Sequence, residues 1–282
     1  MIDKTMYRST LMSWKSKLVG VSLPAIRHLH GAFTLFSRGN LQPPIDRASF
    51  LASLPIGPSL EIGPFDAPLL QGRHVKYFDL LDQENLRLRA VEHGRNPDGC
   101  PHIDYVSPLG NVQIVKDSFA VVLSSHVIEH QPDFVRHLND VSAILLPGGS
   151  YYLIIPDRRF CFDHYLPDST YEDVIEASGR NVHTPDAVEK HLLHTTHNDP
   201  LHHWFGRHGA KPTRQMSDKV VAECQRASNG EYVDVHAWFF TPATFSAIVR
   251  TLKERGLISL SIERVHTTAF GSIEFFAVLR KF

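Results

Sequence analysis

Short apolar runs and segments with helical character alternate along the middle of the chain, and this alternation limits the fold more than any other feature. Residues 134–146 carry apolar side chains at helical spacing, and residues 81–93 are rich in Leu, Arg and Glu. Strands that alternate with helices form a parallel, doubly wound sheet with right-handed crossovers. The runs expected to form strands are 59–62, 74–79, 103–106, 119–123 and 150–155.

The end of the chain departs from this alternation. Residues 241–252 predict a helix with Pro242 near its start, where proline is well tolerated. Two β-rich runs follow, 257–265 and 273–279, and only a few residues around Gly271 separate them. Strands so close in sequence must pair antiparallel. We therefore expect an α/β, Rossmann-like sheet that is mostly parallel and ends in an antiparallel hairpin.

Composition and charge exclude several classes of protein. The chain of 282 residues has a formal net charge of -1, so it carries no general basic field for nucleic acid. Its cysteines, Cys100, Cys161 and Cys224, are odd in number and widely spaced, which gives neither a disulfide framework nor a Cys-x-x-Cys metal pair. No apolar run reaches the ~18 residues of a membrane span. We expect a cytoplasmic protein with no nucleic-acid partner.

Residues 1–50 form a basic extension ahead of this core. Six Lys and Arg residues from Lys4 to Arg38 are accompanied, before Asp46, by a single acid. Apolar residues around Trp14 recur at roughly helical spacing. The first interpretation is an amphipathic helix that packs on the domain or on a second subunit of a homodimer. A basic helix lying on a membrane surface and an organellar transit peptide are the alternatives.

The stretch from Ser59 to Pro68 ends a predicted strand with an acid, Glu61, and places Gly63 two residues later. A buried parallel strand that stops at a tight turn over a ligand has this pattern, because glycine lets the backbone turn and approach what is bound. By itself the pattern also fits an ordinary strand-turn-helix of an α/β domain.

Further polar residues fall at the ends of the next predicted strands. Asp79 closes the strand that follows Glu61, in the arrangement that lets a carboxylate hold a ribose diol. A solvated strand end is the alternative. Asp104 lies near the end of the next run, and Ser125 and His126 come directly after the central apolar run. We expect these side chains at the carboxyl edge of the sheet.

Together these features resemble the class I S-adenosylmethionine-dependent methyltransferases. The resemblance covers about residues 55–156 and 237–282, and the terminal hairpin fits the same family. It is carried by Leu60–Pro64, Asp79, the element Ser125–His130 with its His-x-x-Glu-His pattern, and Leu146–Gly149. The Leu-Pro-Gly-Gly sequence of the last of these predicts the end of a helix, with glycine in the positive-φ cap.

The resemblance implies S-adenosyl-L-methionine as the cofactor and gives several residues a role at its methionine end. Glu61, Gly63 and Pro64 match the turn that holds the methionine moiety. Ser125 and His126 match the residues after the fourth strand that line the same end of the cofactor.

At the other end of the cofactor, Asp79 matches the acid on the ribose hydroxyls and Asp104 the acidic position near the adenine amine. The sequence also departs from the family pattern. Phe65 and Ala67 stand where the family has its second and third glycines, and Ala120 stands where many members have Asp. Phe65 does not allow the close backbone approach that glycine allows.

Residues 155–164 resemble a bacterial subgroup of these enzymes that is associated with surface-glycan genes. Within them, Arg158 and Arg159 follow a predicted strand at the carboxyl edge. Two interpretations stay open for this pair: a clamp on an anionic substrate such as a phosphorylated sugar, and ordinary surface charge.

The segment 157–236 divides the methyltransferase-like core into 51–156 and 237–282. At ~80 residues it is too long for a connecting loop, so we expect it to fold as a helical cap over the substrate. Its helix candidates are 170–177, 185–193 and 216–227.

This cap is rich in histidine, and three interpretations of that richness stay open. One is a metal site in which His191, His194 and His197, spaced three apart, are joined by Glu129 and His130 from the core. The others are histidines that hydrogen-bond one another and the substrate, and histidines with only structural roles. The spacing matches no tight zinc signature, so we assign no metal ligand from the sequence.

Methyl transfer to a hydroxyl needs a base above the methyl group of the cofactor. His130 is the first candidate, followed by His164 and His236. The structural alternative for His130 is that it orients the helix after the fourth strand.

The sequence therefore predicts S-adenosylmethionine-dependent methyl transfer to an oxygen of a small-molecule or glycan-linked acceptor. One alternative is a non-catalytic binding or scaffold protein built on a decayed methyltransferase core, which the altered glycine turn motivates. The other is a nicotinamide-dependent sugar-modifying enzyme on a related sheet.

Overall fold

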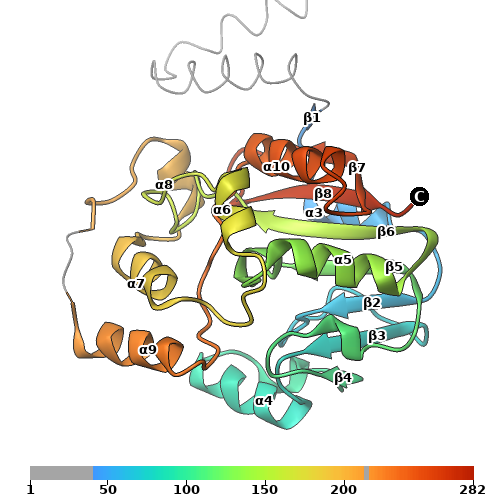
Figure 1. The fold of residues 1–282 in the computed structure, drawn as a ribbon, viewed down its shortest axis with the longest axis horizontal. Coiled ribbons are helices and arrows are strands. Elements are labelled where there is room, and N and C mark those ends of the chain that lie inside the picture. The colour runs from blue at the N-terminus through green and yellow to red at the C-terminus, as the bar shows by residue number, and fades with distance from the viewer. Residues whose placement is uncertain (1–40, 213–215) are drawn as a thin grey trace, which may run out of the picture.

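The computed structural model describes residues 41–212 and 216–282, and within them a single eight-stranded sheet has the order β1-β7-β8-β6-β5-β2-β3-β4 (Figure 1). The strands are β1 (Leu41–Gln42), β2 (Ser59–Ile62), β3 (Val75–Asp79), β4 (Tyr105–Val106), β5 (Phe119–Ser125), β6 (Leu145–Pro156), β7 (Ser261–His266) and β8 (Glu274–Arg280). All pairs are parallel except those that β8 makes with β6 and β7. The predicted mixed sheet with its terminal antiparallel pair is confirmed.

Helices follow the strands as the periodicity predicts. In the core they are α3 (Arg47–Ala52), α4 (Gln83–Glu92), α5 (Phe134–Ile144) and α10 (Pro242–Glu254), with short 3₁₀ turns η1 (Pro97–Gly99), η2 (Val112–Ile114) and η3 (Ile128–His130). The side chain of Thr241 accepts a hydrogen bond from the Thr244 N–H and so caps α10. Residues 63–74, after the Glu61 turn, form turns and bends instead of a helix.

The central strands are buried on both faces, which explains their continuous apolar sequence. Because side chains alternate along a strand, Leu153 and Ile155 join one core with α5 and α10. Tyr152 and Ile154 join a second core that contains Phe50 of α3. The sheet thus lies between helices on both faces, as in a doubly wound fold.

The structure changes one local prediction, the helix end at Leu146–Gly149. Helix α5 ends at Ile144, Leu145 is already extended, and β6 begins there. Gly148 does have a positive φ of 75°, but it lies in β6 and does not cap the helix. Gly149 is needed for close approach, because a Cβ there would lie 2.9 Å from the Leu146 carbonyl oxygen and 3.1 Å from that of Ala120.

The N-terminal extension lies mostly outside the described residues, since these begin at Leu41. Strand β1 pairs with β7, and Phe50 of α3 is fully buried against the sheet. Residues 41–50 therefore pack with the core, although we grouped them by sequence with the extension. The amphipathic pattern around Trp14 belongs to the part that is not described.

Four helices form the segment between β6 and α10: α6 (Tyr171–Glu176), α7 (Pro185–His194), α8 (Pro200–Trp204) and α9 (Asp218–Ser228). Three of them match the helices predicted from sequence, and α8 was missed. Figure 1 shows α7, α8 and α9 together at the left-hand end of the sheet. Their role as a cap over a substrate stays a prediction.

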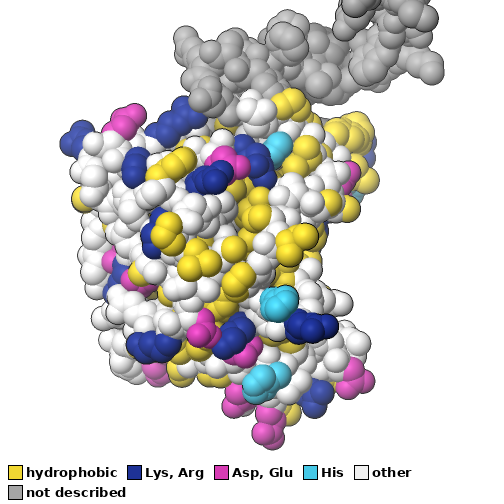
Figure 2. All heavy atoms as spheres, turned by 90° about the vertical axis from the view of Figure 1, so that its right-hand side faces the viewer, with side chains coloured by type: hydrophobic (Ala, Val, Ile, Leu, Met, Phe, Trp, Pro, Cys, Tyr) yellow, Lys and Arg dark blue, Asp and Glu magenta, His cyan; other side chains and the backbone are white. Residues whose placement is uncertain are grey.

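The right-hand end of the molecule in Figure 1 has a mixed surface. Figure 2 shows that, among the described residues, hydrophobic side chains form a broken band there and charges of both signs are interspersed. Of the helices in the described ranges, none has the length and apolar character needed to cross a membrane.

We expect Phe50→Ala to lower the free energy of unfolding by about 3–5 kcal/mol, because it leaves a cavity in the second core. The ring stacks on Phe276 at 4.8 Å and contacts Tyr152 at 5.2 Å between ring centroids. Urea unfolding followed by circular dichroism measures the change. The matched control is Ile56→Ala, whose side chain is fully exposed and which should change stability by less than about 0.5 kcal/mol. Equal losses in both variants would contradict this account of α3.

Candidate functional site

A cavity of about 500 Å³ lies at the carboxyl ends of β2, β3 and β5. Its walls include Gly63 after β2, Asp79 at the end of β3, and His126 and Val127 after β5. Strand β2 pairs with β3 on one side and with β5 on the other, so the chain changes direction across the sheet at this point. Ligands of open α/β sheets bind at such a switch point.

The turn after β2 adopts a conformation that favours glycine. Gly63 has a φ of 73°, and a Cβ there would lie 2.7 Å from Cγ2 of Val127. Phe65 also has a positive φ, of 45°, although it is not glycine. Its ring lies 5.2 Å from the Arg95 guanidinium and lines the same cavity. The turn therefore keeps a left-handed conformation at Phe65, where the family pattern has its second glycine.

Glu61 does not line the cavity. Its buried carboxylate accepts hydrogen bonds from the backbone N–H groups of Leu69 (2.9 Å) and Leu70 (2.8 Å), and so fixes the loop after the turn. Burial raises the pKa of Glu61 to about 7, against the opposing effect of these two hydrogen bonds. Pro64 is buried and is also absent from the cavity wall. The cofactor roles assigned to both residues stay predictions.

Of the two acids assigned to the ribose and adenine ends, only Asp79 faces the cavity. Burial raises its pKa to about 6, and its side chain accepts a hydrogen bond from the Leu81 N–H at 3.3 Å. Asp104 is exposed and accepts from the Tyr77 N–H at 2.9 Å. Ser125 likewise does not line the cavity. The structure thus brings Gly63, Asp79 and His126 together and leaves Asp104 and Ser125 apart from them.

His126 lines the cavity in a left-handed conformation, with a φ of 54°. Its Nε2 lies 3.1 Å from Oε2 of Glu274, and each carboxylate oxygen of Glu274 accepts one hydrogen bond from Arg47. Burial acts to raise the pKa of Glu274, but His126 and Arg47 outweigh it and lower that pKa to about 2. A carboxylate and a strained backbone therefore hold the His126 ring in place.

His130, the first candidate base, also lines the cavity. Its Nδ1 lies 2.9 Å from Oδ1 of Asp234, which forms an ion pair with Arg89 of α4. Burial acts to lower the pKa of His130, but the pairing with Asp234 and the charge of Glu129 outweigh burial and raise it. The same pairing holds the pKa of Asp234 well below its usual range despite burial.

Behind His130 lies a fully buried carboxylate, that of Glu129 in η3. His236 lies beside it, and its Nδ1 shares a hydrogen bond of 2.6 Å with Oδ2 of Asp163. Burial, with a smaller effect from charge on His130, lowers the pKa of His236 to about 3. The rings of His130 and His236 meet edge to face at 4.5 Å.

A second cavity, of about 280 Å³, lies on the far side of this cluster. His236 lines it, whereas His130 lines the first cavity, and Pro132 lines both. Its other walls carry acidic, basic and hydroxyl side chains from α6, α7 and the loops beside them, among them Asp173, Arg180 and Lys190. The cluster around Glu129 therefore lies between the first cavity and the second, polar cavity.

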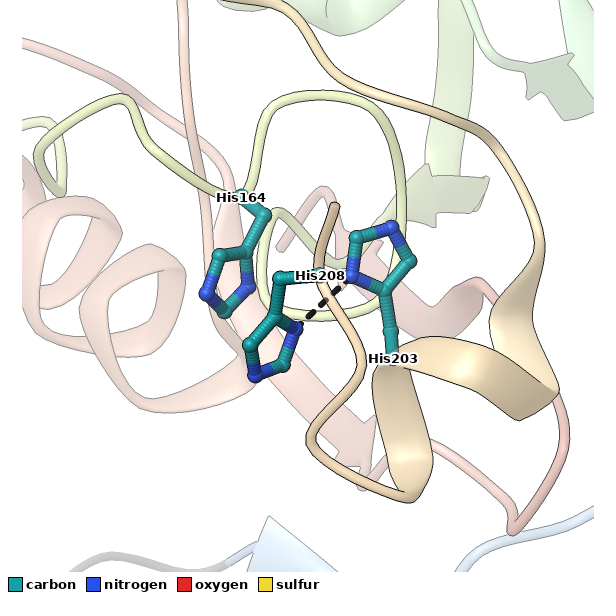
Figure 3. A group of neighbouring side chains, drawn as sticks. All are labelled: His164, His203 and His208. Atoms are coloured by element: carbon teal, nitrogen blue, oxygen red, sulfur yellow. Dashed lines mark hydrogen bonds between the residues drawn. The ribbon is translucent and has the colours of Figure 1, made fainter. Parts of the chain in front are cut away.

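His164, the other candidate base, is not at either cavity. Its ring stacks on that of His208 at 3.5 Å, and His203 Nδ1 lies 3.0 Å from His208 Nδ1 (Figure 3). The Nδ1 of His164 lies 2.9 Å from the Arg159 carbonyl oxygen. We do not carry His164 forward as the base.

Two other groups from the sequence analysis have internal partners. Arg159 makes a two-point ion pair with Asp157, and Arg158 pairs with Asp168, so neither acts as a free clamp. Among the described residues, His191, His194 and His197 do not converge on one point as metal ligands would. His194 and His197 instead contact backbone carbonyls.

Sequence reasoning missed Asp234, Arg89 and Asp163 as members of the site. Asp234 and His236 are two positions apart in an extended segment, so alternation could have placed them on one side of the chain. No sequence signal placed Asp163 against His236, because the two are 73 positions apart.

Comparison with known proteins gives a likeness in solved structures only. No protein-family model and no curated protein matches the sequence. Similar structures include the CcbJ methyltransferase from Streptomyces caelestis, at 13% identity and a TM-score of 0.42, covering 83% of this chain and 93% of that one. An S-adenosylmethionine-dependent methyltransferase from Mesorhizobium loti has 16% identity and a TM-score of 0.41, covering 83% and 96%. The identities and TM-scores are too low to assign a function to this chain.

The stability of the fold should depend on pH through its buried histidines. His137 is one whose contribution can be measured separately. Burial lowers its pKa from 6.5 to about 3, while its Nε2 keeps a 2.8 Å hydrogen bond with Tyr151. The unfolded state binds a proton below pH 6.5 and the folded state does not. Stability that is present above pH 6.5 is therefore lost as the pH falls, by up to about 1.4 kcal/mol per pH unit.

We expect His137→Gln to flatten this dependence in urea unfolding measured at successive pH values, with exposed His102→Gln as the control. Glu61 acts in the opposite direction between pH 4.5 and about 7, because its pKa is raised. The prediction therefore concerns the difference in pH dependence between His137→Gln and the His102→Gln control. An unchanged slope in His137→Gln would show that His137 is protonated in the folded state.

Proposed function

We propose that this protein is an S-adenosylmethionine-dependent methyltransferase that acts on an oxygen of a small, hydroxyl-rich or glycan-linked acceptor. The observation that carries the proposal is the first cavity. It places the Gly63 turn, the Asp79 carboxylate and the His130 ring around one space at the switch point of the sheet.

The residues of the cavity fit the cofactor. Its volume of about 500 Å³ lies in the usual range for a ligand of this size, roughly 300–1,000 Å³. Asp79 offers a carboxylate to a ribose diol, and Leu80, Leu109 and Val112 offer apolar surface to a flat ring. A Cβ at Gly63 would lie 2.7 Å from Cγ2 of Val127, so the turn beside the cavity requires glycine. The bound cofactor supplies a methyl group on a positively charged sulfur.

The second cavity supports an acceptor with several hydroxyl groups. Carboxylate, ammonium, guanidinium and hydroxyl side chains line it, and sugar hydroxyls hydrogen-bond with all of these groups. The Glu129, His130 and His236 cluster lies where the two cavities approach each other.

With the cofactor bound, the acceptor oxygen would form the new C–O bond as the C–S bond breaks and its electrons stay on sulfur. The hydroxyl proton passes to the cluster around His130. Asp163 orients the His236 ring through a hydrogen bond, and Asp234 pairs with His130 at 2.9 Å. The protein thus aligns the two substrates and accepts one proton.

A binding or scaffold protein on a decayed core is the second candidate, and Phe65 in the glycine turn favours it. Failure to bind the cofactor in calorimetry would support this alternative over methyl transfer.

Asp79→Asn should weaken S-adenosylmethionine binding by at least about tenfold, because a charge-assisted hydrogen bond contributes roughly 1.5–3 kcal/mol. Isothermal titration calorimetry measures the effect. Asp104→Asn is the matched control and should bind like the unchanged protein, since Asp104 does not line the cavity. Equal weakening in both variants would show that Asp104 belongs to the site, and would contradict its placement outside the cavity.

His130→Ala should keep cofactor binding while methyl transfer falls at least ~100-fold, because the variant loses the group nearest the transferred proton. Turnover is measured with methyl-labelled S-adenosylmethionine and the acceptor found in a panel of sugars and small alcohols. Thermal unfolding checks that the variant is folded. Unchanged turnover would refute a role for His130 in the chemistry.

A further inference from the structure

The carboxylate of Glu129 has no hydrogen-bond partner on either oxygen, although the residue is fully buried. A buried carboxylate without a donor carries a large desolvation cost, so native structures supply a partner for such groups. Its neighbour Asp163, also buried, has one oxygen in the same condition. The interior next to the first cavity therefore holds two buried carboxylates with oxygens that no side chain of the described residues hydrogen-bonds.

Histidine nitrogens surround one oxygen of this carboxylate at nearly equal distances. Oε1 of Glu129 lies 3.8 Å from His130 Nε2, 3.9 Å from His236 Nε2 and 3.8 Å from His126 Nδ1. These distances are too long for hydrogen bonds. They are a few tenths of an ångström wider than the roughly 3.3 Å between two ligands of a tetrahedral zinc ion. One atom each from Glu129, His130 and His236 lies within 4.8 Å of the other two.

The other nitrogen of each ring faces a carboxylate. His130 Nδ1 lies 2.9 Å from Asp234, and His236 Nδ1 lies 2.6 Å from Asp163. His126 Nε2 is 3.1 Å from Glu274. A carboxylate that accepts a proton from one ring nitrogen leaves the lone pair of the other nitrogen available. This carboxylate–histidine arrangement is the usual outer shell of a metal-binding histidine.

The other histidine groups in the described chain lack this geometry. In the stack of Figure 3, the rings of His164 and His208 are within 8° of parallel and 3.5 Å apart. Because nitrogen lone pairs lie in the ring plane, two rings stacked in this way cannot both direct a lone pair at one ion. The rings of His130 and His236 are instead at 84° to each other.

In a third group, Asp163 with His191 and His236, the histidine nitrogens that face Asp163 already have hydrogen-bond partners. The Asp163 oxygen nearest His236 is already its hydrogen-bond partner, and His191 Nδ1 accepts from the His236 backbone N–H at 3.3 Å. Asp163 therefore belongs to the outer shell of His236.

We propose that Glu129, His130 and His236 bind one divalent transition-metal cation. Imidazole nitrogen together with one carboxylate oxygen is a donor set that suits zinc and its neighbours, and not magnesium or calcium. Three protein ligands leave a coordination position open, as in catalytic zinc sites. The cation also neutralises the charge that Glu129 and Asp163 bring into the interior.

The place of the site gives the cation a task, and this part rests on the proposed function. His130 lines the first cavity and His236 lines the second, so the ion lies between them. A hydroxyl of the acceptor that binds the open position loses its proton more easily. Because the cation then occupies the lone pairs of His130 and His236, water in the cavity takes that proton in place of the histidine cluster. The oxygen then receives the methyl group in the displacement described above.

The test begins with metal content and needs no acceptor. The full-length chain is purified without chelator, its metal is measured by mass spectrometry, and metal-stripped protein is titrated with Zn²⁺ in a calorimeter. We expect about one equivalent at a single site. Co²⁺ should give the visible absorption bands of a site with nitrogen and oxygen ligands.

Variants assign the ligands. Glu129→Gln keeps the shape of the side chain and should weaken Zn²⁺ binding by at least about 100-fold, whereas Asp163→Asn should weaken it by about tenfold as an outer-shell change. His164→Gln in the stack and exposed His202→Gln are controls that should bind Zn²⁺ like the unchanged protein. If Glu129→Gln does not fold in a thermal unfolding test, the partly exposed His130→Gln replaces it.

Less than a tenth of an equivalent of metal together with no Zn²⁺ binding would overturn the site. Unchanged binding in Glu129→Gln, or a loss in His164→Gln as large as in Glu129→Gln, would overturn it as well. The two proposals fail separately. Zn²⁺ binding without S-adenosylmethionine binding supports the metal site and refutes the methyltransferase. Cofactor binding without Zn²⁺ binding supports the methyltransferase and refutes the metal site.

Discussion

The backbone carbonyl of Glu129 connects the two halves of the site. It accepts hydrogen bonds from the N–H groups of Ala237 (2.7 Å) and Trp238 (3.1 Å), where the chain returns from its helical segment to the core. This pair of bonds brings Asp234 and His236 to His130. Without it the buried Glu129 side chain would face no histidine from the returning segment.

Around this connection, burial sets the chemistry of the ionisable groups. Desolvation raises the pKa of Asp79 to about 6 and lowers that of His236 to about 3, while pairing with His130 and Arg89 keeps Asp234 ionised. Asp163 fixes the tautomer of His236 through a hydrogen bond, and Asp234 lies 2.9 Å from the outer nitrogen of His130. A lone pair held in a fixed direction serves proton transfer when no cation is bound and metal binding when one is.

The elements that sequence predicted best are those whose pattern is local. Strands β2, β3, β5 and β6 and helices α5 and α10 follow from apolar runs, helical spacing and the early Pro242. The short α8 and the early β1 carried too few residues for a period to show. The helix cap predicted at Leu146–Gly149 is wrong, because Gly149 instead allows close contact between strands.

The sequence by itself determined the mixed sheet, the Gly63 turn, and the placing of Asp79, His126 and His130 after their strands, because alternation and strand ends are properties of neighbouring residues. Only the tertiary structure decided which of these side chains face the cavity. It turned Glu61 toward Leu69 and Leu70, and it turned Asp104 toward Tyr77. It also placed Asp163 on His236 across 73 positions of sequence, since such a contact depends on how the whole chain packs.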